Sequence, residues 1–159
     1  MTFSTADLYD AHESSVQVVL PGFRDYGGRK RFSGPVSTIE VYEDNSLVRS
    51  ALEEPGEGRV LVVDGGASMR CALVGDKLAQ LAMDNGWSGV IVCGCIRDSG
   101  VIAGLDLGLK ALGTNPRKSV KKNSGERDVT VNFSGITINP GDYIYADEDG
   151  ILVSRVSLF

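Results

Sequence analysis

Two short runs of β-branched residues and leucine constrain the fold more than any other feature. They occupy residues 60–63, which Gly58 and Asp64-Gly65-Gly66 bound, and residues 89–93, which begin with Gly89. Continuous apolar runs of this length are typical of strands that are buried on both faces, as in parallel sheets. Between them, Leu78, Leu81 and Ala82 recur at helical spacing. The order strand, helix, strand predicts a βαβ unit, whose crossover is right-handed in nearly all proteins.

Shorter elements are expected on both sides of this unit. Helices are predicted over 5–15, 47–52 and 105–112, and strands over 16–20, 36–42, 129–133, 136–138, 143–146 and 151–154. Ser134-Gly135 and the acidic DEDG turn are hairpin signals. Asp64-Gly65-Gly66 reads as a tight turn from a strand into a helix. The sequence therefore predicts an α/β fold in one domain, residues 1–159, with a central βαβ unit and short antiparallel strands.

Charge and composition exclude several classes of protein. The 159 residues carry 16 Lys and Arg against 21 Asp and Glu, a net charge of −5, which argues against direct binding of nucleic acid. No apolar run approaches the roughly 18 residues of a membrane span, and the N-terminus shows no secretory signal. Three cysteines without a signal peptide predict reduced thiols and a cytoplasmic location. The single histidine, His12, argues against zinc sites built from histidine and against a Ser-His-Asp triad.

Arg97 and Asp98 are the first candidates for chemistry. They follow the strand predicted over 89–93, and ligands of α/β sheets bind beyond the carboxyl ends of strands. Arginine offers a planar fork for a carboxylate, and aspartate offers a hard oxygen ligand for Mg²⁺ or Mn²⁺. The alternative is a solvated ion pair in a surface loop.

The helix start at 75–78 is the second candidate. Gly75, Asp76, Lys77 and Leu78 open the helix of the βαβ unit, where free backbone N–H groups form a ready site for a carboxylate or phosphate. The alternative is an ordinary helix N-terminus in which Asp76 complements the helix dipole. The two candidates support each other, because one βαβ unit would bring both to the same edge of the sheet.

Other motifs point away from common enzyme classes. Asp64-Gly65-Gly66 lacks the G-x-G-x-x-G pattern, and the sequence shows no glycine-rich loop for an adenosyl cofactor. Cys93 and Cys95 are expected as buried thiols rather than as a metal or redox pair. The basic run over 117–122 is interpreted as a solvated loop, with an anion or partner patch as the alternative.

Several longer stretches resemble one family. They are FSGPVSTI (32–39), VVDGG (62–66), GDKLAQLA (75–82), GVIVCGCIRDSG (89–100) and GDYIYADEDGILV (141–153). In order and spacing these stretches are similar to the RraA family, which joins the regulator of ribonuclease activity A to the 4-hydroxy-4-methyl-2-oxoglutarate aldolases. The resemblance covers nearly the whole chain. It implies a three-layer β/β/α swivelling domain that assembles as a homotrimer with active sites between subunits.

The resemblance also implies a reaction and its site. The aldolase members are class II pyruvate aldolases that depend on a divalent metal, and many also decarboxylate oxaloacetate. Carried over by motif, Gly75, Asp76, Lys77 and Leu78 would hold the pyruvyl carboxylate of the substrate. Arg97 would bind substrate and Asp98 would hold Mg²⁺ or Mn²⁺. The cation and Arg97 would both stabilise the enolate formed when the carbon–carbon bond breaks.

A second branch of the family gives the competing prediction. Regulator-type members bind and inhibit the ribonuclease E machinery, and they can lack the acidic residue after the arginine. This chain keeps Asp98, which favours the aldolase, with binding to a ribonuclease E-type partner as the alternative. Longer aldolases carry an additional C-terminal segment, whereas this sequence ends at Phe159. We therefore expect oxaloacetate decarboxylation to be retained more readily than optimal aldol cleavage.

Overall fold

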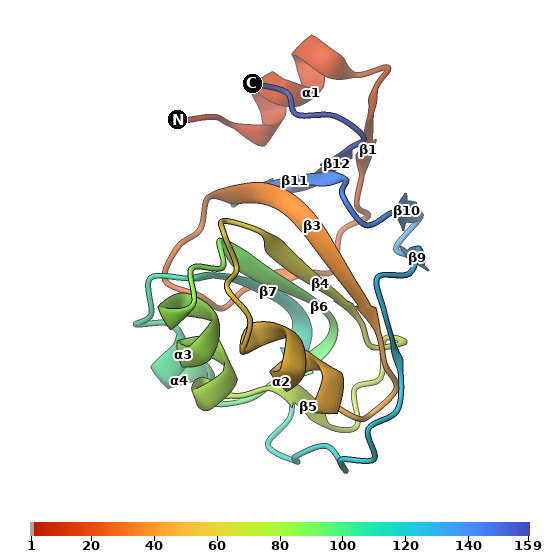
Figure 1. The fold of residues 1–159 in the computed structure, drawn as a ribbon. Coiled ribbons are helices and arrows are strands. Elements are labelled where there is room, and N and C mark those ends of the chain that lie inside the picture. The colour runs from red at the N-terminus through yellow and green to blue at the C-terminus, as the bar shows by residue number, and fades with distance from the viewer. Residues whose placement is uncertain (1) are drawn as a thin grey trace.

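The computed structural model describes residues 2–159 and is built on one large, strongly curved mixed sheet (Figure 1). Its helices are α1 (Thr5–His12), α2 (Ser46–Leu52), α3 (Asp76–Asp84) and α4 (Ser99–Ile102). Its strands are β1 (Val16–Val18), β2 (Arg24–Asp25), β3 (Phe32–Glu40), β4 (Val60–Asp64), β5 (Ala72–Val74), β6 (Gly89–Ile96), β7 (Gly108–Thr114), β8 (Glu126–Arg127), β9 (Val131–Phe133), β10 (Ile136–Ile138), β11 (Tyr143–Asp147) and β12 (Gly150–Ser154). The main path through the sheet is β1-β12-β11-β3-β4-β6-β7-β2.

Strand β3 joins two differently organised parts of this sheet. Residues 32–35 pair antiparallel with β11, and residues 36–40 pair parallel with β4. Strands β4, β6 and β7 continue the parallel part, and β5 adds to β6 near its end. The ring of Phe32 lies against Gly89 and Gly108, where a Cβ atom would collide with it. Glycine at these two positions thus lets β3 cross closely over the parallel strands.

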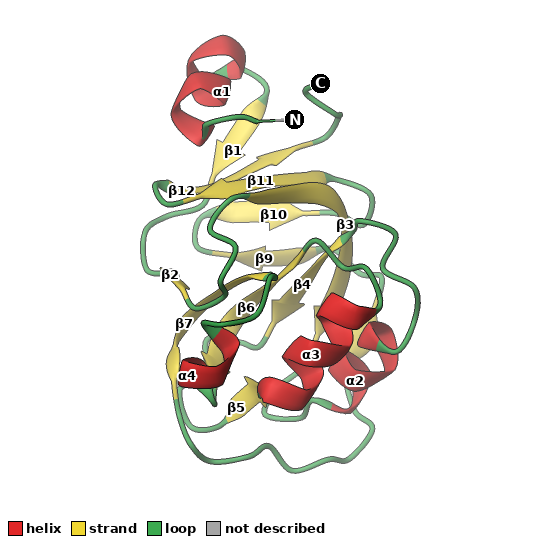
Figure 2. Cartoon of the chain, turned by 90° about the vertical axis from the view of Figure 1, so that its left-hand side faces the viewer, coloured by secondary structure: helices red, strands yellow, loops and turns green. Residues whose placement is uncertain are grey.

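Apolar side chains fill both faces of the parallel strands. Leu61 and Val63 face a core made with α2, α3 and α4, whereas Val60 and Val62 face a second core made with β9 to β12. Figure 2 shows α2, α3 and α4 on one side of the parallel strands, and the antiparallel strands with α1 on the other. All four side chains are fully buried, and each contributes about 1.5–3 kcal/mol of transfer free energy. Burial on two faces explains why the run is continuous rather than alternating.

The predicted βαβ unit and hairpins are confirmed. Strand β4 leads through the short strand β5 and α3 to β6, and β4 and β6 pair in parallel register. Strands β9 and β10 pair antiparallel across Ser134 and Gly135, which have φ values of 48° and 77°. Two successive positive φ values are typical of the type I′ hairpin turn. The hydroxyl of Ser4 caps α1 by accepting a hydrogen bond from the N–H of Asp7 at 3.1 Å.

Two local predictions are wrong. The helix expected over 105–112 is instead strand β7, because Leu109 and Ala111 face the helix-side core in alternation and the backbone pairs with β6. The Asp64-Gly65-Gly66 turn leads to strand β5 and not to a helix. The Asp64 carboxylate accepts a hydrogen bond from the N–H of Gly66 at 2.9 Å and so closes that turn. Strand β3 also begins earlier than expected, at Phe32.

No helix within residues 2–159 combines the length and the hydropathy that crossing a bilayer requires.

Candidate active site

The start of α3 and the end of β6 meet at one edge of the parallel sheet. Strands β5 and β6 are parallel neighbours, and Val74 pairs with Ile96 at their carboxyl ends. The backbone N–H of Arg97 continues this pairing by donating to the carbonyl of Val74 at 2.9 Å. The chain then enters α4 after Asp98, while β5 enters α3 after Gly75. Both candidate motifs therefore reach the same place, as the βαβ interpretation predicts.

Asp98 is turned toward the first residue of α3 by its backbone. It has φ 60° and ψ 37°, in the left-handed region that aspartate tolerates better than most residues. One carboxylate oxygen, Oδ2, accepts a hydrogen bond from the N–H of Asp76 at 3.0 Å. The first N–H groups of a helix have no partner within the helix. Asp98 takes one of them and leaves those of Lys77 and Leu78 for a ligand.

Gly75 leaves the space that this arrangement needs. A Cβ atom at this position would lie 2.9 Å from Oδ2 of Asp98 and 3.4 Å from Nε of Arg97. Any larger residue would therefore displace the carboxylate or the guanidinium. Gly75 is in an extended conformation, with φ −115° and ψ −169°, so the requirement is for space rather than for an unusual backbone angle.

A cleft of about 150 Å³ joins all six predicted residues. Its lining includes Gly75, Asp76, Lys77, Leu78, Arg97 and Asp98. The side chain of Leu78 is buried in the helix-side core, whereas that of Lys77 is exposed. Leu78 can therefore serve a ligand through its backbone N–H, and Lys77 can serve through its N–H and its ammonium group.

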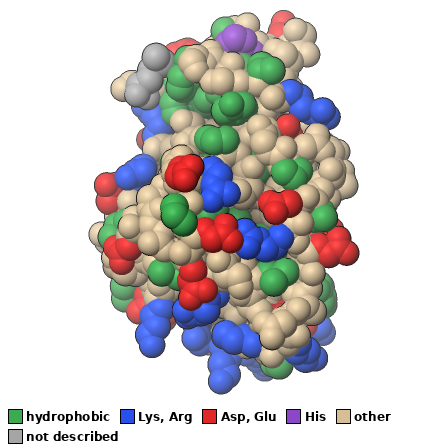
Figure 3. All heavy atoms as spheres, viewed as in Figure 1, with side chains coloured by type: hydrophobic (Ala, Val, Ile, Leu, Met, Phe, Trp, Pro, Cys, Tyr) green, Lys and Arg blue, Asp and Glu red, His purple; other side chains and the backbone are tan. Residues whose placement is uncertain are grey.

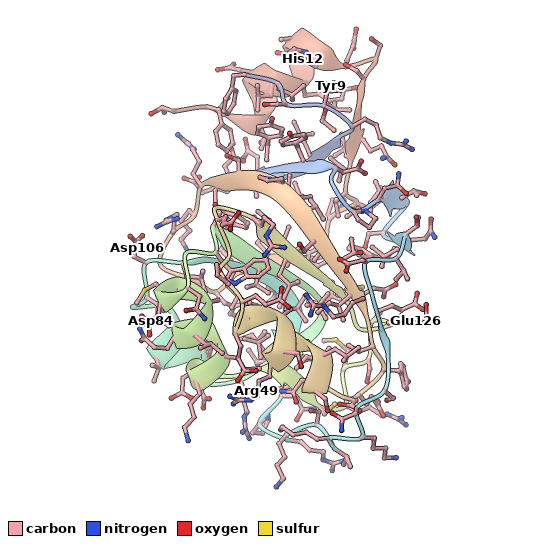
Figure 4. The ribbon with its side chains drawn as sticks, viewed as in Figure 1. Tyr9, His12, Arg49, Asp84, Asp106 and Glu126 are labelled. Atoms are coloured by element: carbon pink, nitrogen blue, oxygen red, sulfur yellow. The ribbon has the colours of Figure 1, made fainter. Side chains whose placement is uncertain are left out.

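The cleft also contains residues that the sequence interpretation missed. They are Asn45, Arg49, Ala72, Lys118, Ser119 and Lys121. Lys118 and Lys121 belong to the basic run, for which the sequence favours a solvated loop over an anion patch. Arg49 projects from α2 (Figure 4), and no local motif marks it. The sequence signal that pointed to Lys118 and Lys121 was the basic run over 117–122 itself, through its alternative interpretation as an anion patch.

Asn45 and Ser119 hold the far wall of the cleft in place. The hydroxyl of Ser119 donates to Oδ1 of Asn45 at 2.9 Å, and the N–H of Asn45 lies 3.2 Å from the same hydroxyl. The side-chain amide of Asn45 donates to the carbonyl of Leu73 at 3.0 Å. These bonds connect the basic segment, the start of α2 and strand β5, so the wall is fixed relative to Asp98.

The charge of the cleft suits an anionic ligand. Five cationic side chains line it, from Arg49, Lys77, Arg97, Lys118 and Lys121, against the carboxylates of Asp76 and Asp98. Within residues 2–159, none of these five cations is paired with a carboxylate. The guanidinium of Arg97 donates to the carbonyl of Pro116 at 3.3 Å, which orients it while leaving other N–H groups for a ligand.

The residues present fit a hydrated divalent cation. Asp98 supplies an exposed carboxylate, and Oδ2 is the oxygen that accepts the hydrogen bond from Asp76. No group of three or more His, Cys, Asp or Glu among residues 2–159 is arranged to enclose a metal. Mg²⁺ commonly keeps several waters and uses one or two carboxylates plus substrate oxygens. Asp98 matches that kind of site rather than a cage made wholly of protein ligands.

Cys93 and Cys95 are buried thiols, as predicted from the sequence, and they do not line the cleft. Cys71, Cys93 and Cys95 are free and buried. Burial raises the pKa of Cys93 to about 11 and also raises the pKa of the other two thiols. A thiol with a raised pKa is a poor nucleophile and a poor metal ligand at neutral pH.

Comparison with known proteins gives the family. The model described as "RraA-like: Aldolase/RraA" matches residues 5–153. The chain belongs to the RraA-like family. A relative from Alkalilimnicola ehrlichii, named "Putative 4-hydroxy-4-methyl-2-oxoglutarate aldolase", is 63% identical over 99% of this chain and 98% of its own length. A relative of the same name from Aromatoleum aromaticum is 61% identical over 99% of both chains.

Two solved structures share the RraA-like fold over nearly the whole chain. The RNA-processing inhibitor RraA from Thermus thermophilis shares 44% identity and a TM-score of 0.94, covering 98% of this chain and 94% of that one. A structure described as an S-adenosylmethionine:2-dimethylmenaquinone methyltransferase, from Geobacillus kaustophilus, shares 50% identity and a TM-score of 0.97, covering 98% and 97%. The names differ while the fold is shared, so the choice of activity rests on the site.

Proposed function

We propose that this protein is a lyase that uses a divalent metal to break carbon–carbon bonds in pyruvyl acids. Its reactions are aldol cleavage of 4-hydroxy-4-methyl-2-oxoglutarate and decarboxylation of oxaloacetate. The observation that carries the proposal is the junction of Asp98, Arg97 and the start of α3 in one cationic cleft. The names of the relatives that share 63% and 61% identity support the same substrate.

Different residues of the cleft bind the substrate and stabilise the charge that develops during the reaction. The N–H groups of Lys77 and Leu78 receive the pyruvyl carboxylate at the start of the helix, where the dipole favours an anion. Arg97 places a fixed positive charge beside the keto group, and this charge stabilises the enolate that develops as the bond breaks. Arg49, Lys118 and Lys121 offer charges for a second carboxylate of the substrate.

Asp98 is the residue that would hold the metal, Mg²⁺ or Mn²⁺. When bound, such a cation acts as a Lewis acid that polarises the keto oxygen. The hydrogen bond from Asp76 orients the carboxylate for this role, because it fixes Oδ2 against the start of α3.

Pyruvate release tests the proposal. We would offer oxaloacetate and 4-hydroxy-4-methyl-2-oxoglutarate separately, couple the release to lactate dehydrogenase and correct for spontaneous decarboxylation. Release that requires Mg²⁺ or Mn²⁺ and stops with EDTA is expected. No release from either substrate with either metal would overturn the proposal.

Methyl transfer is not proposed, although one similar structure carries that name. Adenosyl cofactors bind at a glycine-rich loop between the first strand of a doubly wound sheet and its helix. Here the turn at Asp64-Gly65-Gly66 is closed by the Asp64 carboxylate and leads to strand β5. Asp64-Gly65-Gly66 is the stretch of the sequence most similar to such a loop, and in the structure it does not connect a strand to a helix.

Regulation of an RNA-degrading nuclease is the second candidate. The likeness to an RNA-processing inhibitor, with a TM-score of 0.94, favours it. A ribonuclease E-type partner would be captured at low salt and released as the salt concentration rises. Capture that persists in an Asp98→Asn variant would show that binding is independent of the proposed metal site.

We further infer four properties of the whole molecule. The two cores on opposite faces of β4 and β6 support a single domain over residues 1–159 and the three-layer β/β/α swivelling architecture. The three free thiols suit the reducing cytoplasm. The family resemblance supports a homotrimer, which light scattering on the purified protein would test.

A further inference from the structure

The basic segment between β7 and β8, which contains the basic run over 117–122, lies between two clefts. On one side lies the candidate active site, and on the other lies a larger cleft of about 500 Å³, within the size range of ligand sites. Lys118 and Ser119 line both. Arg97 and Asp98 do not line the larger cleft, whereas Arg117 and Lys122 line it and not the smaller one. The larger cleft is thus a separate feature of the surface.

The backbone of this segment is held firmly although it is not regular structure. The buried carboxylate of Asp44 accepts hydrogen bonds from the N–H of Lys122 at 2.7 Å and from the N–H of Ser124 at 3.2 Å. The carbonyl of Arg117 accepts from the N–H of Ala72 at 2.8 Å. Burial alone would raise the pKa of Asp44, but the bonds from Ser46, Ser124 and Lys122 outweigh it and hold the pKa well below its usual range. The segment therefore presents its side chains from a fixed frame.

The cations of the larger cleft are available to a ligand. Among residues 2–159, the side chains of Arg117, Lys118 and Lys122 form no ion pair. Glu43, one of the two carboxylates there, is already neutralised by Arg70, which donates to both of its oxygens at 2.7 and 2.8 Å. Figure 3 shows Lys and Arg side chains gathered at the end of the molecule where the segment runs in Figure 1. This concentration of positive charge contrasts with the net charge of −5 for the whole chain.

Two apolar side chains complete the larger cleft. Tyr42 is 60% exposed and Val120 is 64% exposed, and both line it. The ring of Tyr42 lies close to Gly66, where an added Cβ atom would be 2.9 Å from Cδ1. One edge of the ring is thus supported by the backbone turn, and the rest is open to solvent. Such a ring can pack against the carbon body of a ligand while nearby cations bind its anionic groups.

We propose that the larger cleft is a second binding site, for an organic polyanion with clustered phosphate or carboxylate groups on an apolar or aromatic body. Arg117 and Lys122 bind the anionic groups, and Tyr42 packs against the body. Lys118 is shared with the candidate active site, so a polyanion bound here weakens the affinity of that site for its own anionic ligand. The proposal requires neither turnover nor a metal and does not rest on the proposed function.

Calorimetric titration of the metal-free protein at low ionic strength tests the site. The probes are citrate, tripolyphosphate and ATP, which separate carboxylate from phosphate and show what an aromatic body adds. The test variant is Arg117→Ala with Lys122→Ala. Arg49→Ala removes a cation from the smaller cleft and not from the larger one. Lys30→Ala removes an exposed cation that forms no ion pair with any residue in 2–159. All four positions are on the surface or at the cleft, and thermal unfolding checks that each variant is folded.

We expect the double variant to bind tripolyphosphate and ATP at least about tenfold more weakly, because two charged hydrogen-bond donors are lost. Lys30→Ala and Arg49→Ala should stay within about twofold of the unchanged protein. ATP should bind more tightly than tripolyphosphate, and Tyr42→Ala should remove that difference. Equal affinity in the double variant and in Lys30→Ala would overturn the proposal. So would a larger loss in Arg49→Ala than in the double variant, since it would place the polyanion in the candidate active site.

Discussion

The carboxylate of Asp98 accepts a hydrogen bond from the backbone N–H of Asp76 at 3.0 Å, across 22 positions of sequence. Asp98 reaches this position from a left-handed backbone conformation at the end of β6. The bond uses the first free donor of α3 and leaves the next two facing the cleft. One side chain thereby fixes both the orientation of the proposed metal ligand and the distance between the two motifs.

Replacing Asp98 with asparagine should abolish the chemistry and preserve the fold. The amide oxygen still accepts the hydrogen bond from Asp76, but the negative charge that holds a divalent cation is lost. We expect pyruvate release at saturating Mg²⁺ to fall by about 100-fold or more. Thermal unfolding should change by only a few degrees. The rate is measured with oxaloacetate through coupling to lactate dehydrogenase.

Asp84→Asn is the matched control, because Asp84 lies at the other end of α3 (Figure 4), where its carboxylate accepts a hydrogen bond from the side chain of Gln80 at 2.8 Å. Its activity should match that of the unchanged protein. Full activity in Asp98→Asn would contradict the assignment of the metal ligand.

Lysine should not be able to perform the function of Arg97. The guanidinium uses one N–H to reach the carbonyl of Pro116 at 3.3 Å and keeps others for the substrate. An ammonium group cannot hold that carbonyl and also present a planar fork. We expect Arg97→Lys to lower kcat/KM by about tenfold or more, and Arg97→Ala to lower it further. Arg49→Lys in the same cleft is the comparison. Arg97→Lys with the kcat/KM of the unchanged protein would mean that only the charge of Arg97 matters.

Gly75→Ala should harm activity more than stability. The added Cβ would lie 2.9 Å from the carboxylate oxygen Oδ2 of Asp98, and a flexible side chain can yield to it. The carboxylate then loses its orientation, so we expect turnover to fall by about tenfold or more. An alanine in place of an N-cap glycine costs about 1 kcal/mol or less. Gly100→Ala is the control, since a Cβ there meets nothing within 4 Å. Equal turnover in both variants would refute the role given to Gly75.

The sequence was sufficient where local pattern and burial agree. The apolar runs of β4 and β6 and the helical spacing of α3 predicted the βαβ unit, and that unit placed Arg97, Asp98 and Gly75 together. The hairpin at Ser134-Gly135 followed from turn chemistry alone. In both cases the same residues satisfy the local preference and the final packing.

Other features depend on contacts between distant segments. The local pattern predicts a helix at β7, because its alternation becomes decisive only when β6 lies beside it. Arg49 and Lys121 reach the cleft from segments more than 70 residues apart, and no spacing rule connects them. Asp147 is the first residue of the predicted acidic turn, and the structure places it at the end of β11 and buries it. Its side chain leads to a prediction about stability.

Asp147→Asn should destabilise the protein at neutral pH. The side chain is 3% exposed and accepts hydrogen bonds from the N–H of Thr5 at 2.8 Å, the hydroxyl of Thr5 at 2.6 Å and the N–H of Asp149 at 3.0 Å. The NH2 group of asparagine is a donor, so it cannot accept the hydrogen bonds that one of the two carboxylate oxygens now accepts from Thr5 or Asp149. We expect a loss of about 1–3 kcal/mol in the free energy of unfolding, measured with urea. Asp149→Asn, exposed in the same turn, should change it by less than about 0.5 kcal/mol.

The destabilisation caused by Asp147→Asn should become smaller in acid. Burial would raise the pKa of Asp147, but the hydrogen bonds from Thr5 and Asp149 outweigh burial and lower it. A carboxylate whose pKa is lower in the folded state contributes stability above its unfolded pKa, about 3.9, and loses that contribution as the pH falls through the folded value. The difference in unfolding free energy between the unchanged protein and Asp147→Asn should therefore be constant from pH 6 to 8, and should shrink below about pH 4. A difference that stays constant down to pH 3 would show that the charge of Asp147 contributes nothing.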